Sequence, residues 1–447
     1  MLKPMDNMGA KWKLAKASMI IQFIWFYAVI TGLSPSVLRA AIMFTILQIG
    51  KTMMRQTNIY NTISGSAVLL MILNPFIITQ IGFQLSYLAV LGIVYLYPKI
   101  YPLLTIGCSD IPKHTLQTNP VRKVMSFFRH DLKWFTFKIS DGAWQIIVVS
   151  LSAQIATTPL SLFYFHQFPN LFLIANLIVI PISSLLMYSG VFLLFFSSVP
   201  FLAEWPAGIL NILLHELNRF IFYFQKIPYA MTEGISIGVG IMLLMYILFL
   251  VIFWFLESGR PKTLIIGATI LFTICCLWAY DEINRANIRQ VAVYDIPKRK
   301  AMAFIANNQV FPVLDETLLT NLSSIRFHIK PHWWQSGVDE EDQKIAKVYN
   351  TEFGKLFLFS GKKILVVDSE IRRVPFELQN KLQTDIVVLS NNRTVYIDQL
   401  RKLISFKLIV FDSSNQHHKA IRWQNECARL GLKCWNVKTE GAFIYNI

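Results

Sequence analysis

The amino-acid sequence predicts an α-helical polytopic membrane bundle followed by a soluble α/β domain. Hydrophobic residues occupy 54% of the 447 positions and charged residues only 15%, whereas a soluble domain usually carries about 25% charged residues. Residues 1–282 hold 18 Lys and Arg with 10 Asp and Glu, and the shorter segment 283–447 holds 24 and 16. We therefore place a membrane domain at 1–282 and a soluble domain at 283–447.

Long apolar segments fill the first of these domains. A membrane-crossing helix needs roughly 20 mostly apolar residues, and the candidates are about 17–33, 35–54, 59–74, 76–97, 142–163, 171–197, 206–225, 235–256 and 263–280. The segment 59–74 is short and is compatible with a tilted or re-entrant helix, and 171–197 is open to a break at Pro181. Because 206–225 carries His215, Glu216 and Arg219, it either crosses the membrane or lies along its surface. We expect seven to nine transmembrane or interfacial helices.

The distribution of basic residues predicts an orientation. Cytoplasmic loops collect Lys and Arg because positive charge is hard to translocate. If all nine segments cross, one side receives Lys51 and Arg55, the basic loop 99–138, and Arg260 with Lys262, whereas the short loops of the other side hold only Lys226. This predicts a multi-pass protein of the cytoplasmic (inner) membrane, with a cytoplasmic N-terminus and an extracytoplasmic C-terminal domain.

Arg39 is the most informative single residue of the membrane half. It lies about one turn into a helix that Pro35 begins and Ser34 caps. A charge at bilayer depth costs about 2.5 kcal/mol or more, so such residues usually face a cavity or a partner. The alternative is that Arg39 extends to the lipid headgroups, which its position near the helix start permits.

Further polar residues interrupt the apolar segments. Gln84, Ser86 and Tyr87 share one segment, Gln154 lies in the next, and His166 and Asn176 follow. Polar groups in lipid must find partners, so these segments are expected to pack around something. Two readings stay open: hydrogen bonds that hold a bundle together, or a polar conduit lined by broken helices.

The same segments resemble the competence membrane domain of the ComEC family. The resemblance covers about residues 28–225 and rests on several motifs in the same order: Gly32–Met43, Asn74-Pro75, Gly82–Gly92 (GFQLSYLAVLG), Ser152–Leu160, Phe165-His166-Gln167 and Asn176–Pro181. It implies a channel component that imports single-stranded DNA across the cytoplasmic membrane during natural transformation. It also implies that seven residues belong to the family's polar core and are DNA-conduit candidates: Arg39, Gln84, Ser86, Tyr87, Gln154, His166 and Asn176.

One departure from the family lies at the front of the chain. ComEC-like proteins usually begin with additional spans and an OB-like domain, whereas the competence motifs here begin within about 30 residues of Met1. The resemblance therefore implies an N-terminally truncated member.

The C-terminal half alternates strands with helices. Short runs rich in Val, Ile and Phe predict strands at 291–295, 301–306, 357–360, 363–368, 385–390 and 407–412, a closing strand through 435–437 and 443–445, and helices at 397–403 and 419–430. This order resembles the metallo-β-lactamase-like domain of many ComEC proteins, with Asp295 and Asp315 near family strand ends.

The metal ligands of that resemblance are missing. Two-metal hydrolysis needs clustered His and Asp ligands, and the expected His-rich loop reads Ser390-Asn391-Asn392. His328, His332, His417 and His418 form no ligand run, and Pro331 argues against one helix that would carry both His328 and His332. We expect a degenerate metallo-β-lactamase-like domain without catalytic residues, metal or cofactor. Cys427 and Cys434 form either a disulfide or two free thiols.

The predicted partners are single-stranded DNA, membrane lipids, a DNA-receptor protein and a cytoplasmic motor. A separate motor is needed because the sequence holds no Gly-x-x-x-x-Gly-Lys-Ser/Thr phosphate-binding loop. The soluble domain is basic, so it either attracts phosphates or presents a solvated face. Two other functions remain as alternatives, a membrane-anchored nuclease acting on incoming DNA and a multi-pass permease for a small solute.

Overall fold

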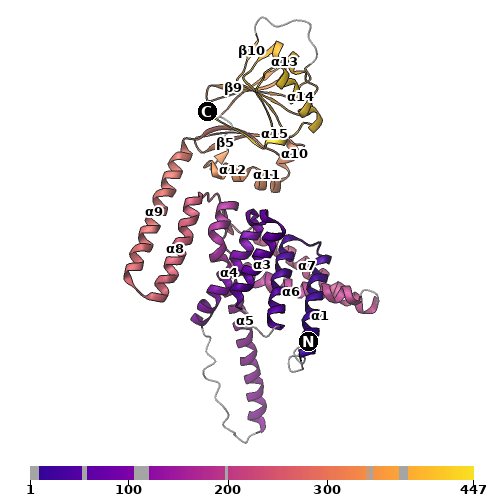
Figure 1. Ribbon diagram of the computed structural model, residues 1–447, viewed down its shortest axis with the longest axis vertical. Coiled ribbons are helices and arrows are strands. Elements are labelled where there is room, and N and C mark those ends of the chain that lie inside the picture. The colour runs from indigo at the N-terminus through magenta and orange to yellow at the C-terminus, as the bar shows by residue number, and fades with distance from the viewer. Residues whose placement is uncertain are drawn as a thin grey trace. The chain divides into compact units, whose positions relative to one another are not determined.

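The computed structural model describes residues 10–52, 58–104, 120–196, 200–338, 340–341, 346–371 and 381–447. The chain divides into two compact units, Met1–Thr232 and Glu233–Ile447, whose elements are labelled in Figure 1. The predicted boundary between residues 282 and 283 falls inside the second unit, near the end of its helical part. The domain boundary between residues 282 and 283, which we infer from the change in charged-residue content, stays a prediction.

The first unit is helical. Its elements are α1 (Ala10–Ile30), α2 (Pro35–Thr52), α3 (Ile59–Leu73), the 3₁₀-helix η2 (Pro75–Thr79), α4 (Ile81–Ile100), the 3₁₀-helix η3 (Tyr101–Leu104), α5 (Pro120–Phe165), β1 (Gln167–Pro169), α6 (Phe172–Phe196), α7 (Pro200–Gln225) and β2 (Met231–Glu233). Local sequence starts these helices: Asn58 accepts a hydrogen bond from the Tyr60 amide and Asn74 from the Phe76 amide. Both asparagines thereby satisfy amides that a helix start leaves without partners.

The apolar helices agree with the predicted membrane bundle. By length and composition, five helices among the described residues can cross a membrane: Ile81–Leu103, Ser140–Phe165, Phe172–Phe196, Val239–Ser258 and Pro261–Ala286. Leu14–Ile30, Pro35–Gly50 and Ile59–Leu73 are shorter apolar helices. A helical membrane region followed by a domain with sheets is therefore confirmed, and how many of the helices cross stays a prediction.

The break of α6 considered at Pro181 is not observed, because the helix runs unbroken from Phe172 to Phe196. The membrane span predicted at 142–163 agrees with the apolar part of α5, Ser140–Phe165. The helix α5 itself begins earlier, at Pro120, and continues through Pro159. A proline removes one amide donor and leaves the rest of the hydrogen-bond ladder intact, and membrane helices tolerate this where neighbours compensate. Conduits lined by broken helices therefore find no support in these two segments.

The second unit begins with a helical hairpin and continues into two sheets. The hairpin is α8 (Val239–Ser258) and α9 (Pro261–Ala286), separated by Gly259, which adopts a left-handed φ of +61°. One sheet has the order β14-β13-β11-β9-β8-β7 and the other β15-β3-β4-β5-β6. Their bounds are β3 (Arg289–Val293), β4 (Ala301–Ala306), β5 (Gln309–Leu314), β6 (Glu340–Glu341), β7 (Lys347–Thr351), β8 (Gly354–Phe359), β9 (Lys362–Val367), β11 (Ile386–Leu389), β13 (Leu408–Phe411), β14 (Cys434–Asn436) and β15 (Phe443–Asn446).

The two sheets pack face to face, and helices cover their outer faces. Alternate residues of one strand serve opposite cores: Ile364 and Val366 of β9 pack against the other sheet, and Leu365 and Val367 pack against helices. The helices on that side are α13 (Ile397–Leu403) and α14 (His417–Arg429), whereas α10 (Glu316–Leu319), α11 (Leu322–His328) and α12 (Lys330–Gln335) cover the five-stranded sheet. The predicted α/β domain is confirmed as a four-layer arrangement.

The predicted strand runs omit β7, and of β5 they include only its end, which the resemblance placed near Asp315. The prediction also joins two strands that are separate. Asn307 and Asn308 both adopt left-handed φ values and connect β4 to β5, as a tight hairpin turn requires. The predicted closing strand is two strands in different sheets, because β14 pairs with β13 and β15 pairs with β3. Between them the short helix α15 (Val437–Glu440) and Gly441, with φ +85°, redirect the chain.

The helical hairpin and the sheets of the second unit are joined through Arg285, near the end of α9. Its Nη2 donates a hydrogen bond of 3.0 Å to the Ser236 carbonyl oxygen, and its Nη1 lies 3.3 Å from a Glu282 carboxylate oxygen. A Cβ atom on Gly337 would lie 2.9 Å from the Arg285 Cβ, so the two backbones approach closely there. Glu233 also forms an ion pair with Arg326 of α11. These contacts explain why the hairpin belongs to the C-terminal unit.

Candidate functional site

The helix α2 places Arg39 inside the helical unit. The Leu38 amide donates to the Ser34 carbonyl oxygen at 2.9 Å, so Arg39 follows directly on the first turn. Its side chain is only 5% exposed, and within the described residues no hydrogen bond reaches its Nε atom. The guanidinium lies beside Gly82 of α4: a Cβ atom there would be 3.6 Å from Nη2 and 3.8 Å from Nη1. Of the two alternatives for Arg39, burial against a neighbouring helix is the one observed.

Tyr87 of α4 lies on the same side of the bundle as Arg39. Its hydroxyl oxygen is 2.9 Å from the Ser66 Oγ, and that Oγ donates at 2.7 Å to the Ile63 carbonyl oxygen. With its single proton used in this way, Ser66 must accept from Tyr87. The Tyr87 oxygen therefore keeps its lone pairs free to face Arg39, with which it interacts electrostatically.

Gln84 connects three elements. Its Nε2 donates to the Ile78 carbonyl oxygen of η2 at 2.9 Å, and its Oε1 accepts from the Tyr164 hydroxyl of α5 at 3.2 Å. The structure therefore forms two sets of contacts along α4: Arg39 and Tyr87 with Gly82 and Ser66, and Gln84 with Ile78 and Tyr164. Ser66, Gly82 and Tyr164 were not predicted as site residues. We use the name polar cluster for the residues of the two sets that lie on α2 to α5, namely Arg39, Ser66, Gly82, Gln84, Tyr87 and Tyr164. Serine and tyrosine are common in membrane helices for many reasons, so only the tertiary contacts identify Ser66 and Tyr164 as members.

The remaining candidates lie outside the polar cluster. The Gln154 Nε2 donates within α5 to the Thr158 Oγ1 at 3.5 Å. Ser86 and Asn176 are half-buried on α4 and α6, and the described residues provide no hydrogen bond to either side chain. His166 is buried and ends α5 with a left-handed φ of +55°. That a single polar core contains all seven candidates stays a prediction.

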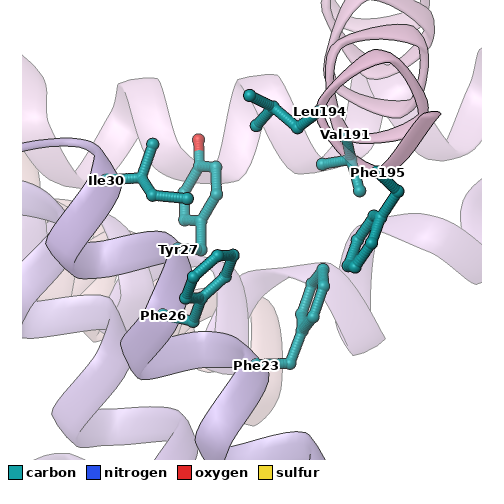
Figure 2. Close-up of a pocket in the computed structure, with 7 residues that line it drawn as sticks. All are labelled: Phe23, Phe26, Tyr27, Ile30, Val191, Leu194 and Phe195. Atoms are coloured by element: carbon teal, nitrogen blue, oxygen red, sulfur yellow. The ribbon is translucent and has the colours of Figure 1, made fainter. Parts of the chain in front are cut away.

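A separate apolar pocket lies between α1 and α6. It is lined by Phe23, Phe26, Tyr27 and Ile30 of α1 and by Val191, Leu194 and Phe195 of α6. Figure 2 shows side chains of the two helices pointing toward one another across the pocket. None of these residues is a predicted site residue, and the lining is aliphatic and aromatic except for the hydroxyl group of Tyr27.

In the soluble domain, polar residues gather where β9, β11 and β13 end. The Asp412 carboxylate accepts hydrogen bonds from the Ser390 Oγ at 2.6 Å, the Ser414 amide at 3.1 Å and the Asn415 Nδ2 at 3.0 Å. The predicted loop residues Asn391 and Asn392 donate their backbone amides to the Ser414 Oγ and the Asn415 Oδ1. This network ties the loop after β11 to the loop after β13.

The donor set at this edge does not fit the metal pair that the metallo-β-lactamase resemblance implies. The oxygens of Asp412 are taken by Ser390, Ser414 and Asn415, and Asp295 accepts from the Ser413 hydroxyl. Asp368 and Asp412 interact electrostatically with the ammonium of Lys300, whose pKa is lowered by burial and raised by those two carboxylates. Within the described ranges, no group of three His, Cys, Asp or Glu side chains is arranged to hold a metal ion.

His328 and His332 of this domain lie away from the network around Asp412, in helices α11 and α12. His332 contacts the Tyr294 hydroxyl through Nδ1 at 2.9 Å and the Gln290 amide through Nε2 at 3.3 Å, and burial lowers its pKa. His328 ends α11, whereas Pro331 lies in the first turn of α12, so no single helix carries both histidines, as predicted. Cys427 and Cys434 are free thiols, and burial raises the pKa of Cys427 to about 12.

Asp412 gives a testable pH dependence. Burial raises its pKa from 3.8 to about 6, so between these values the folded state holds a proton that the unfolded state has lost. Stability therefore falls as pH rises through this window. For Asp412→Asn, which cannot titrate, we expect the free energy of unfolding to rise relative to the original protein by roughly 2 kcal/mol between pH 4 and pH 7. Denaturant titrations of both proteins measure this difference, and parallel pH profiles would contradict it.

Comparisons with known proteins bear on both halves of the chain. Residues 2–259 match the family described as competence protein, and residues 291–447 match the ComEC C-terminal domain. The chain belongs to the competence protein family. It is 27% identical over 167 residues to ComE operon protein 3 of Bacillus subtilis (strain 168), a match covering 37% of this chain and 17% of that protein. No solved structure matches the chain.

The family assignment confirms the resemblance on which the sequence-based prediction rested. It also supports a multi-pass membrane protein, because the matched region contains most of the apolar helices. The matched part of the Bacillus protein is a small fraction of its length, so that protein's activity and partners do not transfer directly. The likeness of the competence chain's soluble domain to metallo-β-lactamases stays a prediction.

Proposed function

We propose that this chain is a component of a membrane conduit through which single-stranded DNA crosses the cytoplasmic membrane during natural transformation. Membership of the competence protein family supports this proposal. The observation that carries it is a buried guanidinium in a helical unit whose first four α-helices contain no acidic residue. No Asp or Glu occurs between Asp6 and Asp110, so α1 to α4 offer a polyanion positive charge without repulsion.

The proposal assigns no covalent chemistry to this chain. Its soluble domain has carboxylates at the expected edge, but hydrogen bonds and Lys300 already satisfy them. Nothing in the sequence matches a nucleotide-driven motor. We infer that a DNA receptor delivers the strand and that a separate cytoplasmic motor draws it inward.

Transport by the purified full chain tests this function. Fluorescent oligothymidylate is supplied in excess outside proteoliposomes that contain the chain, so that its concentration gradient replaces the motor. We expect it to enter a compartment protected from external nuclease, and the recovered DNA to be full length. Empty liposomes are the control. Equal uptake by empty liposomes would contradict the conduit. Shortened products that require a divalent cation, and that disappear in Asp412→Ala, would instead favour the nuclease alternative.

The proposed orientation places the N-terminus in the cytoplasm and the soluble domain outside. It rests on the asymmetry of Lys and Arg between loops, of which Arg55 and Lys113 lie outside the described residues. Alkaline phosphatase, which folds only outside the cytoplasm, is expected to be active when fused after Ile447 and inactive when fused after Arg260. The reverse pattern would overturn the orientation.

A further inference from the structure

The N-terminus of α4 has the features of an anion site. The helix is 20 residues long, and its N-cap residue Gln80 provides no side-chain hydrogen bond to the first turn. The amides of Phe83 and Gln84 donate to the Gln80 carbonyl oxygen, and those of Ile81 and Gly82 precede the first intrahelical bond. These amides and the helix dipole favour negative charge at this end.

A second, independent feature directs positive charge to the same place. Arg39 reaches from α2 so that its two Nη atoms lie nearest the position of a Gly82 Cβ, at 3.6 and 3.8 Å. Arg39 is only 5% exposed, and within the described residues no hydrogen bond reaches its Nε atom. Gly82 itself is exposed. A glycine at this point leaves no side chain between the guanidinium and the exposed backbone at the start of α4.

No carboxylate of the neighbouring helices balances this charge. The sequences of α2, α3, α4 and α6 contain no Asp or Glu. The helix α5 carries Asp131 and Asp141, and Asp141 accepts a hydrogen bond from the Tyr101 hydroxyl. A buried charge without a partner is costly. Tyr87 offers only a neutral oxygen. Within the described part of the helical unit, no carboxylate is thus in place to balance Arg39, and the guanidinium is suited to an anion from outside the chain.

We infer that Arg39, with the first amides of α4 above Gly82, binds one phosphodiester of the translocating strand. This inference rests on the proposed conduit function and assigns one DNA-binding site within the conduit. A phosphodiester monoanion suits a guanidinium, which offers two parallel donors to its oxygens. A lipid headgroup carries the same phosphodiester chemistry, and the experiment below separates the two sources.

The test follows the reactivity of Arg39 itself, so DNA bound elsewhere on the chain does not interfere. The full chain in phosphate-free maltoside micelles is treated with phenylglyoxal, and peptide mass spectrometry gives the modification rate of Arg39. We expect oligothymidylate to slow this rate and the uncharged methylphosphonate analogue to leave it unchanged. Arg219, exposed beside Glu216 on α7, is the internal control and is expected to react equally throughout.

Gly82→Ala separates this role from a structural one. An alanine Cβ would meet the guanidinium at an ordinary 3.6 Å, and alanine favours a helix over glycine, so the variant is expected to fold with unchanged or higher thermal stability. The added methyl group occupies the open space. We expect loss of the protection by oligothymidylate, with Arg39 still reactive.

Three outcomes would overturn the assignment: no protection in the original chain, equal protection by the methylphosphonate, or full protection in Gly82→Ala. Protection by phosphatidylglycerol that oligothymidylate cannot displace would make a lipid the occupant instead. Each outcome is independent of transport. If Arg39 is not protected but proteoliposomes still import DNA, the conduit function holds and the phosphodiester site at Arg39 is rejected. If Arg39 is protected but import fails, the conduit function is rejected and the site holds.

Discussion

Replacing Arg39 with alanine is expected to lower uptake of single-stranded DNA at least about tenfold, the loss that corresponds to one charge-assisted hydrogen bond. The guanidinium is the only Lys or Arg side chain between Lys16 and Lys51, so no neighbouring cation of α1 or α2 replaces it. Uptake is measured in proteoliposomes or in a transformable host that lacks its own competence membrane protein. Gln84→Leu, which loses its contacts with Ile78 and Tyr164, is expected to act in the same direction.

The matched control is Arg219→Ala. Arg219 is exposed on α7 and paired with Glu216, so its loss is expected to leave uptake near the original level. Membrane insertion of every variant is checked by protease protection and by the elution volume of the solubilised protein. Normal uptake by a well-inserted Arg39→Ala protein would count against the conduit function.

Replacing Gly92 with leucine is expected to destabilise the helical unit by at least about 3 kcal/mol, the upper range for overpacking. A Cβ atom at Gly92 would lie 2.4 Å from the Ala156 Cβ and 2.7 Å from the Ser152 carbonyl oxygen. The second of these is a backbone atom, which cannot move aside without shifting α5. Small residues at such crossings let membrane helices approach closely. The thermal midpoint of the full chain in maltoside measures the effect.

Gly65→Leu provides the comparison for this variant. Gly65 lies on α3 in the same unit, is exposed, and has nothing within 4 Å of its Cβ position. Both substitutions add the same side chain to a membrane-type helix, so the difference between them isolates the contact between α4 and α5. Equal thermal midpoints for the two variants would show that α4 and α5 do not pack in this way.

Helix packing at Gly92 and the hydrogen bonds of the polar cluster together position α4. Tight packing at Gly92 holds α4 against α5, and Tyr164 of α5 then reaches Gln84 of α4. On the other side of α4, Tyr87 contacts Ser66 of α3. The helix carrying the proposed anion site is therefore positioned by hydrogen bonds to both neighbours, which keeps its first turn beside Arg39.

Composition and periodicity by themselves determined the membrane bundle, the soluble α/β domain and most element positions. Lipid and water select strongly for residue type, so long apolar runs and short Val- and Ile-rich strands are readable without tertiary information. The helix starts at Pro35, Asn58 and Asn74 are local for the same reason. The missing histidines of the soluble domain were likewise evident from composition.

Only the tertiary structure decided which polar residues meet. Arg39 meets Gly82 and Tyr87, and Gln84 bonds to Tyr164 of another helix, whereas Gln154 bonds along its own helix, although sequence spacing treats these polar residues alike. Whether α6 breaks at Pro181 depended on the backbone around it, and β14 and β15 separated into different sheets through their pairing partners. Helix rotation and strand pairing arise from contacts between residues distant in sequence, and a single sequence carries no direct record of those contacts.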